Sequence, residues 1–407
     1  MRKVKIGEIT DSCLGKMLDA EKNKGEYAPY LANANVRWGT FDLTSLPQMR
    51  FELHEQERYG LKYGDLVMCE GGEPVRCAIW KDEIPGMKIQ KALHRIRPHE
   101  CVDVYWLYYW FLACGQRHLL DRFFIETTIK HLPGDRLKEI ELDLPSYEVQ
   151  KSIGEVLSKL DEKINLNTRL CAELEAMAKT LYDYWFVQFD FPDEHGCPYR
   201  TSGGEMEWCP RLKKEIPKGW KTGNLYDIAD YINGLACQNY RPAEGDSSLP
   251  VIKIREMHEG ISADTESVSA NIPTKYIIED GDILFSWSAT LEAMYWTGGK
   301  GGLNQHIFKV IPKEDYPKEY VYHQLSTYII NFVKMAEARK TTMGHITSDH
   351  MQQSRIVLPP TPVLRQFHAS IAATHDRIIR CKKENRELSQ LRNWLLPMLM
   401  NGQAKLK

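Results

Sequence analysis

Residues 144–157 read LPSYEVQKSIGEVL, and residues 358–371 read LPPTPVLRQFHASI. Each stretch opens with a Leu-Pro pair and continues with apolar residues three or four positions apart, and the two pairs lie 214 residues apart. Apolar residues at this spacing predict an amphipathic helix. The sequence therefore predicts one structural unit that occurs twice and ends each time in a helix.

The same offset aligns the sequence upstream of the two Leu-Pro pairs. Residues 91–98, KALHRIRP, match residues 305–312, QHIFKVIP, and residues 127–132, TTIKHL, match residues 341–346, TTMGHI. A period of this length is far too long for a solenoid. We therefore expect two copies of a domain followed by a helical tail. For the two TT stretches we expect a turn that leads into a strand rather than a direct contact with a binding partner.

Beyond the first Leu-Pro pair, apolar residues recur in alternating steps of four and three, as in a coiled coil. No Pro and a single Gly, Gly154, occur from residue 147 to residue 186, which predicts one continuous helix. Its partner is expected in the second copy of the same chain. The predicted seam consists of Ile153, Leu157, Leu160, Ile164, Asn167, Leu174, Leu181 and Trp185 in the first helix and Ile371, Ile378, Asn385, Leu388 and Leu395 in the second.

Polar residues interrupt both seams. Arg392 occupies a seam position in the second helix, and Pro397 is expected to end or kink that helix. Asn167 and Asn385 either fix the register of the helices or are interfacial residues without such a role. Both readings remain open at this point.

Composition narrows the class of protein. With 407 residues, 43% of them hydrophobic, and 53 Lys+Arg against 55 Asp+Glu, the chain can build two or three packed domains, and it is not a uniformly basic nucleic-acid coat. The 10 cysteines form no CxxC pair, and His195, Cys197 and Cys209 lack a fourth ligand, so we expect reduced thiols of a cytoplasmic protein and no metal. The apolar stretch 104–114 is too short to span a membrane and predicts a buried helix.

Two basic segments without any acidic residue occur at equivalent places in the repeat, residues 88–98 and 300–313. Such segments are either solvated faces or surfaces for DNA, and because they recur in both copies both readings stay open. Trp80, Trp287 and Trp296 are expected in the core or at a domain interface rather than stacked on bases. Candidate DNA-binding residues, chosen for donor groups that suit bases or phosphate, are Arg76, Lys91, His94 and Arg95 in the first copy and Arg255, Asn304, Gln305, His306 and Lys309 in the second.

Catalytic signatures are missing from the sequence. No Walker, HExxH, GxSxG or strand-to-helix GxGxxG motif occurs, and residues 298–302, GGKGG, indicate a tight turn rather than a phosphate-binding loop. No Asp/Asn-Pro-Pro-aromatic tetrapeptide of an adenine methyltransferase is present. We expect no catalytic residue and no cofactor in this chain.

Several stretches of the sequence resemble the motifs of one known protein family. Residues 144–164 and residues 185–189, WFVQF, resemble the conserved region of type I restriction-modification specificity subunits. Residues 196–220 look like that family's passage into a second target-recognition domain, and residues 64–79 and 281–306 are similar to two types of such domains. The likeness covers nearly the whole chain. The second copy departs from the pattern, because Pro362 and Leu364 stand where the first copy has Glu148 and Gln150.

The resemblance implies an α+β fold in which two similar target-recognition domains, related by an internal pseudo-two-fold repeat, are separated by two long antiparallel helices. The expected segments are a first recognition domain at 1–145, a conserved helix at 146–190, a linker at 191–218, a second recognition domain at 219–358 and a second conserved helix at 359–407. Each recognition domain is expected to read one half of a bipartite DNA site.

The resemblance further implies partners. Two methyltransferase subunits would dock on the helices and bring S-adenosylmethionine to adenines, and two motor-endonuclease subunits would bring ATP and magnesium chemistry. The setting would be the cytoplasm of a prokaryote, without membrane association. Two other classes stay open: a coiled-coil scaffold with two protein- or ligand-binding heads, and a DNA-modifying enzyme whose motif is not recognisable.

Overall fold

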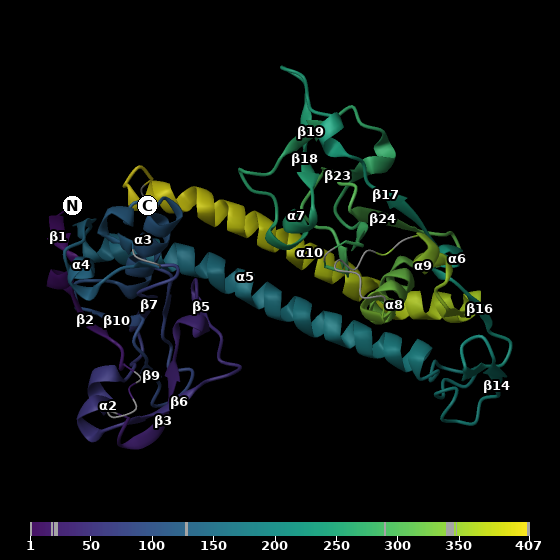
Figure 1. The fold of residues 1–407 in the computed structure, drawn as a ribbon, viewed down its shortest axis with the longest axis horizontal. Coiled ribbons are helices and arrows are strands. Elements are labelled where there is room, and N and C mark those ends of the chain that lie inside the picture. The colour runs from purple at the N-terminus through teal and green to yellow at the C-terminus, as the bar shows by residue number, and fades with distance from the viewer. Residues whose placement is uncertain are drawn as a thin grey trace. The chain divides into compact units, whose positions relative to one another are not determined.

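The computed structural model describes residues 2–17, 19, 23–126, 129–288, 290–338, 346 and 348–404. The chain divides into two compact units, which we treat separately. The first unit consists of residues 1–163 and 388–407, and the second of residues 164–387. Both mix helices and strands (Figure 1), and both contain part of two long helices, α5 (Tyr147–Tyr182) and α10 (Thr361–Met400).

The first unit is built on two small sheets. A four-stranded antiparallel sheet has the order β2 (Thr10–Leu14), β10 (Leu93–Pro98), β7 (Leu66–Cys69), β8 (Cys77–Ile79), and a three-stranded sheet has the order β6 (Gln48–Phe51), β3 (Glu26–Leu31), β9 (Lys88–Ile89). The remaining elements are β1 (Arg2–Lys5) paired with β13 (Glu141–Leu144), β4 (Val36–Arg37) with β5 (Thr40–Phe41), β11 (Ile125–Glu126) with β12 (Lys130–His131), and helices α1 (Ile6–Ile9), α2 (Leu53–Tyr59), α3 (Val104–Gln116) and α4 (Gly134–Lys138).

The second unit repeats this plan. Its antiparallel sheet has the order β17 (Ala229–Asn233), β24 (Ile307–Pro312), β21 (Ile283–Ser286), β22 (Glu292–Tyr295), and its second sheet the order β19 (Ser267–Ser269), β18 (Ser248–Ile252), β23 (Gly301–Leu303), β20 (Ile277–Ile278). The remaining elements are β16 (Lys221–Gly223) paired with β25 (Ile356–Leu358), β14 (Met206–Cys209) with β15 (Lys214–Pro217), and helices α6 (Leu225–Ile228), α7 (Ile254–Glu259), α8 (Lys318–Ala338) and α9 (Ser348–Gln352).

The registers of the strands confirm the internal repeat. His94 on β10 pairs with Leu14 on β2, and Phe308 on β24, which the 214-residue offset aligns with His94, pairs with Asn233 on β17. Strands β3 and β9 pair in parallel, as do β18 and β23. Thr127, Thr128 and residues 341–345, which include most of the predicted TT stretches, lie outside the described residues.

Each unit has its own core. The apolar stretch at residues 104–114 forms the buried helix α3, as the sequence predicts, and the carboxylate of Asp103 caps it by accepting a hydrogen bond from the Trp106 amide at 2.8 Å. In the second unit an aromatic core gathers around Trp185, Phe186 and Phe367. Among the described helices, none is long and apolar enough to cross a bilayer.

The two long helices depart from the predictions at their ends. Helix α5 is α-helical to Tyr182 and continues as a π-helical turn, Asp183–Val187. Pro397 is expected to end or kink helix α10. The helix does not end there but runs on to Met400. Its last turns are held in the core of the first unit, where Leu396 and Leu399 are fully buried.

Candidate nucleic-acid interface

A turn between the last two strands of each repeat forms the centre of the candidate site. We call residues 90–92 the first tip and residues 304–306 the second tip. In the first tip the Leu93 amide donates to the Gln90 carbonyl at 3.1 Å, and in the second the Ile307 amide donates to the Asn304 carbonyl at 3.1 Å. The 214-residue offset thus relates two turns with the same main-chain geometry.

A glycine on the neighbouring strand fixes each tip. The Gly15 amide donates to the Leu93 carbonyl at 2.9 Å, and the Gly234 amide donates to the Ile307 carbonyl at 3.0 Å. A Cβ atom on Gly15 would lie 2.2 Å from the Gln90 oxygen, and one on Gly234 would lie 2.1 Å from the Asn304 oxygen. No side chain fits at such distances, so both tips require glycine beside them.

A hairpin also supports each tip through the main chain. The Glu70 amide donates to the Ala92 carbonyl at 2.8 Å, and the Trp287 amide donates to the His306 carbonyl at 3.3 Å. In the first unit this arrangement holds two residues in the left-handed region, Ala92 at φ 82° and Val75 at φ 77°. Such conformations are strained and occur often at functional sites.

The tips differ in the side chains that they present. Lys91 is exposed on the first tip, whereas the second presents exposed His306 and half-buried Gln305, whose Nε2 atoms lie 3.4 Å apart. The Trp287 ring lies 5.6 Å from that of His306, and its Nε1 donates to Asn233 Oδ1 at 3.1 Å. Sequence reasoning missed this position of Trp287 and the exposed Asn233, whereas Trp80 and Trp296 are buried as expected.

Three of the candidate basic residues, His94, Arg95 and Lys309, make hydrogen bonds or ion pairs inside the protein. His94 is buried and its Nε2 bonds the Leu132 carbonyl at 2.8 Å, and burial lowers the pKa of its imidazole. Arg95 is also buried, and donates to main-chain carbonyls that include that of Arg58 at 2.7 Å. These two side chains are therefore not available to DNA in this structure.

Lys309 is the counterpart of Arg95 under the 214-residue offset and has a similar internal role. Its Nζ lies 2.8 Å from the Asp282 carboxylate and donates to the Ile277 carbonyl at 3.0 Å. Both basic side chains thus tie a sheet strand to an adjoining segment. The recurrence of basic residues in the two copies has a structural explanation at this position.

The other three candidates, Arg76, Arg255 and Asn304, already make hydrogen bonds or ion pairs within the protein. Arg76 pairs with Glu73 at 2.8 Å and donates to Asn33 Oδ1 at 3.0 Å. Arg255 pairs with Glu256 at 2.7 Å and keeps 48% of its side chain exposed. Asn304 is buried, and its Oδ1 accepts from the His306 amide at 3.3 Å. Arg255 is the one of these three whose exposure leaves room for a further contact.

The predicted seam residues form helix packing within each unit. In the first unit Ile153 and Leu157 are buried in one core with Leu396 and Leu399, while Leu160 and Leu395 pack on it and Leu388 is half-buried. The exception to apolar packing, Arg392, donates to the Asp161 carboxylate at 2.6 Å, which also accepts from the Tyr109 hydroxyl at 2.7 Å. The charged side chain at this seam position therefore has an ion-pair partner on the other helix.

In the second unit the seam contains a polar layer. Asn167 donates to Glu384 Oε2 at 2.8 Å, and Asn385 donates to the Ile164 carbonyl and to Thr168 Oγ1, each at 3.1 Å. Farther along α5 the Cys171 thiol donates to the Ile378 carbonyl at 3.7 Å, so the contacts move toward the start of α10 and the two helices run in opposite directions here. The other seam residues pack in the same unit: Ile378 in a cluster that Leu174 adjoins, and Trp185 and Ile371 in the main core, against which Leu181 packs.

Large apolar side chains on the helices remain exposed outside the seam. On α10 in the first unit, Trp394 is 63% and Leu391 is 42% exposed. On α5 in the second unit, Leu166 and Met177 are each 54% exposed. Exposed apolar groups mark surfaces for protein partners only where they form a contiguous patch, since single ones are common on any protein. The heptad pattern did not reveal them, because it selects the residues that the two helices bury against each other.

Gln150 explains why the two conserved regions differ in sequence. It is fully buried, accepts from the Asp103 amide at 3.0 Å, and donates to the Cys101 and Pro145 carbonyls at 3.2 and 3.0 Å. Its counterpart Leu364 is also buried. The second copy therefore replaces a hydrogen-bonded contact with an apolar one.

Possible metal ligands are few in the described part of the chain. One group of three, Glu52, His54 and Glu55, has ligand atoms within 4.8 Å of one another, but Glu55 is already ion-paired with Lys16. His195, Cys197 and Cys209 do not form such a group. All ten cysteines are free thiols.

Comparison with known proteins assigns this arrangement to a class of DNA-recognition subunits. Residues 1–176 and 217–390 match the Type I restriction modification DNA specificity domain. The match occurs twice and covers most of the chain. The chain belongs to the family of type I restriction-modification specificity subunits, which confirms the resemblance seen in its sequence.

Individual relatives agree with this assignment. The chain is 24% identical to the type I restriction enzyme MjaIX specificity subunit of Methanocaldococcus jannaschii over 78% of its own length and 73% of the relative's. It is 23% identical to the HindI specificity subunit of Haemophilus influenzae over 68% and 72%. The crystal structure of an S subunit from M. genitalium, 15% identical, aligns over 98% of this chain and 95% of that one with a TM-score of 0.60, which confirms the fold class.

Proposed function

We propose that this chain reads a bipartite, asymmetric site on double-stranded DNA, with one tip at each half-site. The observation that carries the proposal is the repeated tip, in which the same main-chain hydrogen bonds hold different exposed side chains. Related scaffolds with different side chains suit two half-sites of different sequence.

The chemistry of the tips supports this role. A lysine such as Lys91 can bind phosphate or the acceptor edge of guanine, and a glutamine such as Gln305 can pair with adenine through two hydrogen bonds. His306 offers a ring nitrogen beside it, and Arg255, with 48% of its side chain exposed, is a further basic side chain in the same unit. Each mismatch in a half-site costs about 1–3 kcal/mol, so two readers discriminate better than one.

The chain performs no chemistry of its own in this proposal. Two methyltransferase subunits supply adenine methylation from S-adenosylmethionine, and two motor-endonuclease subunits supply ATP- and magnesium-dependent cleavage, all in the cytoplasm of a prokaryote. The exposed apolar residues of the helices, Leu391 and Trp394 in the first unit and Leu166 and Met177 in the second, are the surfaces that we assign to methyltransferase docking.

The test uses the chain together with its methyltransferase partner. Sequencing of methylated adenines in the host should give one split motif. Lys91→Ala should weaken binding at one half-site and lower the log–log salt slope by about one, whereas Gln305→Ala and His306→Ala should weaken the other half-site. Lys151→Ala, which removes an equally charged and exposed side chain from α5, is the control.

Two results would contradict the proposal. One is binding and methylation without sequence preference when the partner is present. The other is methylation or cleavage by the purified chain alone, which would favour an enzyme instead.

The helices supply a second test, since we also propose that they set the unread spacer. Helix α5 has 36 residues and contributes to both units. Four residues inserted beside Asn167 add about 6 Å and nearly one turn. The preferred spacer should lengthen by about one or two base pairs, at roughly 3.4 Å each, while both half-sites stay the same. A changed half-site with the old spacer, in a folded variant, would contradict the spacer role.

A further inference from the structure

The second tip has an exposed amide side chain beside it, that of Asn233. This residue is the last of strand β17. Its main chain is fixed, because Asn233 pairs with Phe308 in the register of the sheet and the amide of the next residue, Gly234, donates to the Ile307 carbonyl at 3.0 Å. The sheet therefore holds the main chain that carries this amide.

The indole of Trp287 joins Asn233 to the tip. Its Nε1 donates to Asn233 Oδ1 at 3.1 Å, and its ring lies 5.6 Å from that of His306. The main chain of Trp287 is bound on both sides, since its amide donates to the His306 carbonyl at 3.3 Å and its carbonyl accepts from the Ile346 amide at 3.1 Å. One fixed indole thus contacts both Asn233 and His306, so these two exposed side chains lie at the same end of the sheet.

The indole also determines which way the Asn233 amide points. An indole N–H is a donor and never an acceptor, so the amide atom that faces it is the oxygen. The Nδ2 group, with its two N–H donors, is then turned away from the indole. Within the part of the chain that the structure describes, no hydrogen bond uses Asn233 Nδ2. Because the side chain is exposed, both donors are open to an acceptor outside the protein.

The first tip has neither member of this side-chain pair. The strand registers place Leu14 at the position of Asn233 and Glu70 at that of Trp287. The main-chain hydrogen bonds at these positions are nonetheless the same in the two tips. Holding a tip in place therefore requires neither the amide nor the indole, which points to a role for the pair outside the fold.

We propose that Asn233 is a further specificity-determining residue, which donates from Nδ2 to an acceptor on the major-groove edge of one base in the second half-site. This inference rests on the proposed function, because it places DNA at the second tip. Acceptors on that edge are N7 and O6 of guanine, N7 of adenine and O4 of thymine. Trp287 is a positioning residue in this arrangement, since it holds Oδ1 and turns the donors outward.

Asn233→Leu, studied in the chain together with its methyltransferase partner, tests the contact. Leucine is close to asparagine in shape, lacks the donors, and already stands at the equivalent position of the first copy, so the unfolding midpoint should not fall. The probes are duplexes in which each base pair of the second half-site is replaced in turn. Competition binding should show that the preference at one position falls at least fivefold, while all other positions keep theirs.

Two results of this scan would overturn the proposal. An equal loss of affinity for every duplex would indicate a contact to phosphate instead of a base. Unchanged preference at every position would show that Asn233 makes no contact with DNA. Asn331→Leu, which replaces an exposed asparagine on α8, is the matched control and should leave every preference unchanged.

A double variant tests the positioning role of Trp287. Trp287→Phe keeps an aromatic ring but removes the Nε1 donor, so it should lower the preference at the same position as Asn233→Leu. If the indole acts through Asn233, the two substitutions together should lower that preference no further than Asn233→Leu alone. Additive losses at that position would contradict the positioning role.

Gln305→Ala separates this inference from the proposed function. If Gln305→Ala weakens the second half-site while Asn233→Leu keeps every preference, the tip reads DNA and only the role of Asn233 is wrong. If both variants keep the affinity and every preference of the parent, the second tip does not read the half-site and the proposed function fails.

Discussion

The carboxylate of Asp280 lies 3.0 Å from the guanidinium of Arg386, so a turn of the second unit's sheet is ion-paired to helix α10. The Lys383 ammonium at 3.1 Å and the Gly299 amide at 2.7 Å complete the contacts of this carboxylate. Burial acts to raise its pKa, but the hydrogen bonds from Gly299, Arg386 and Lys383 outweigh burial and hold the pKa below its usual value. The ion pair thus ties the turn before strand β21 to helix α10.

Replacing Asp280 by Asn should lower the free energy of unfolding by about 1–3 kcal/mol, because charged hydrogen bonds are lost. A folded-state pKa below the usual value means that the carboxylate stabilises the fold above about pH 4 and loses this effect as pH falls. The difference between the variant and the parent in urea unfolding should therefore shrink in acid. Glu279→Gln, whose exposed carboxylate lies 3.9 Å from Lys300, should change stability by less than about 0.5 kcal/mol. Equal effects of both substitutions would contradict a special role for Asp280.

The glycines beside the tips should resist substitution in both units. Gly15→Ala and Gly234→Ala each force the tip to move away from a new Cβ atom, at a cost of about 1–3 kcal/mol. Each should also weaken DNA binding at one half-site. The matched control is Gly71→Ala, where the nearest atom would lie 3.7 Å from the Cβ. Normal stability and binding in the Gly15 and Gly234 variants would show that the tips are not held in this way.

Arg95 and Lys91 should differ in what they support. Arg95→Ala removes the donor of three partly buried carbonyls and a buried guanidinium, so urea unfolding should show a loss of about 1–3 kcal/mol. Lys91→Ala should leave stability within about 0.5 kcal/mol, because Lys91 is exposed. The Lys91→Ala substitution should instead weaken DNA binding and reduce the salt dependence of that binding. The reverse pattern would place the DNA-facing charge on Arg95.

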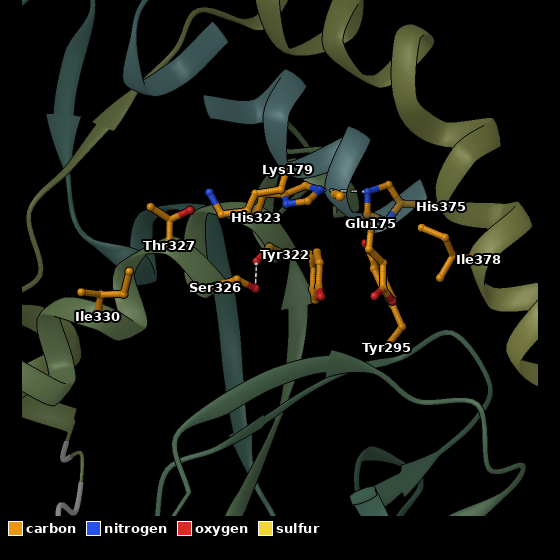
Figure 2. Close-up of a pocket in the computed structure, with 11 residues that line it drawn as sticks. Glu175, Lys179, Tyr295, Tyr322, His323, Ser326, Thr327, Ile330, His375 and Ile378 are labelled. Carbon is orange, nitrogen blue, oxygen red and sulfur yellow. Dashed lines mark hydrogen bonds between the residues drawn. The ribbon is translucent and has the colours of Figure 1, made fainter. Parts of the chain in front are cut away.

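His323 and His375 form a buried pair, with Nε2 atoms 3.0 Å apart (Figure 2), that should make the second unit sensitive to acid. Because the folded-state pKa values are about 3 and about 4, against about 6.5 in the unfolded chain, protons bind preferentially to the unfolded state. Stability is fully present above about pH 6.5 and falls below it, by about 1.4 kcal/mol per pH unit for each histidine, until the folded-state values are reached.

Urea unfolding between pH 7 and pH 4 measures this slope. His323→Gln combined with His375→Gln should flatten it, whereas His118→Gln, which replaces a side chain that is 80% exposed, should not. A slope that persists in the double variant would assign the acid sensitivity to other groups.

The repeat, the long helices and the buried helix α3 could be predicted from the sequence because each depends on local periodicity or on self-similarity. The seam was predicted for the same reason, and residues such as Ile153, Leu157 and Ile378 are buried as helix packing requires. Helix α10 does not end at Pro397, because tertiary burial of the last turns outweighs a local preference.

The site was harder to predict, since residue type shows chemistry but not direction. Lys91, His94 and Arg95 lie within five positions of one sequence segment, yet one points to solvent and two into the protein. Recurrence did not separate the two kinds of basic residue, because a basic residue recurs at Lys309 for a structural reason. Trp287 and Asn233 could not have been linked to His306 without the fold that brings three chain segments together.

The glycine-supported tips have a consequence for how readily recognition can change. Main-chain hydrogen bonds hold each turn in place, and in the second tip the Asn304 side chain adds one to the His306 amide, so the side chains at positions 91, 305 and 306 have little part in maintaining the turns. These positions can therefore be exchanged while the protein still folds. New target sequences could be selected from libraries randomised at these three positions, with both glycines left intact as the fixed frame.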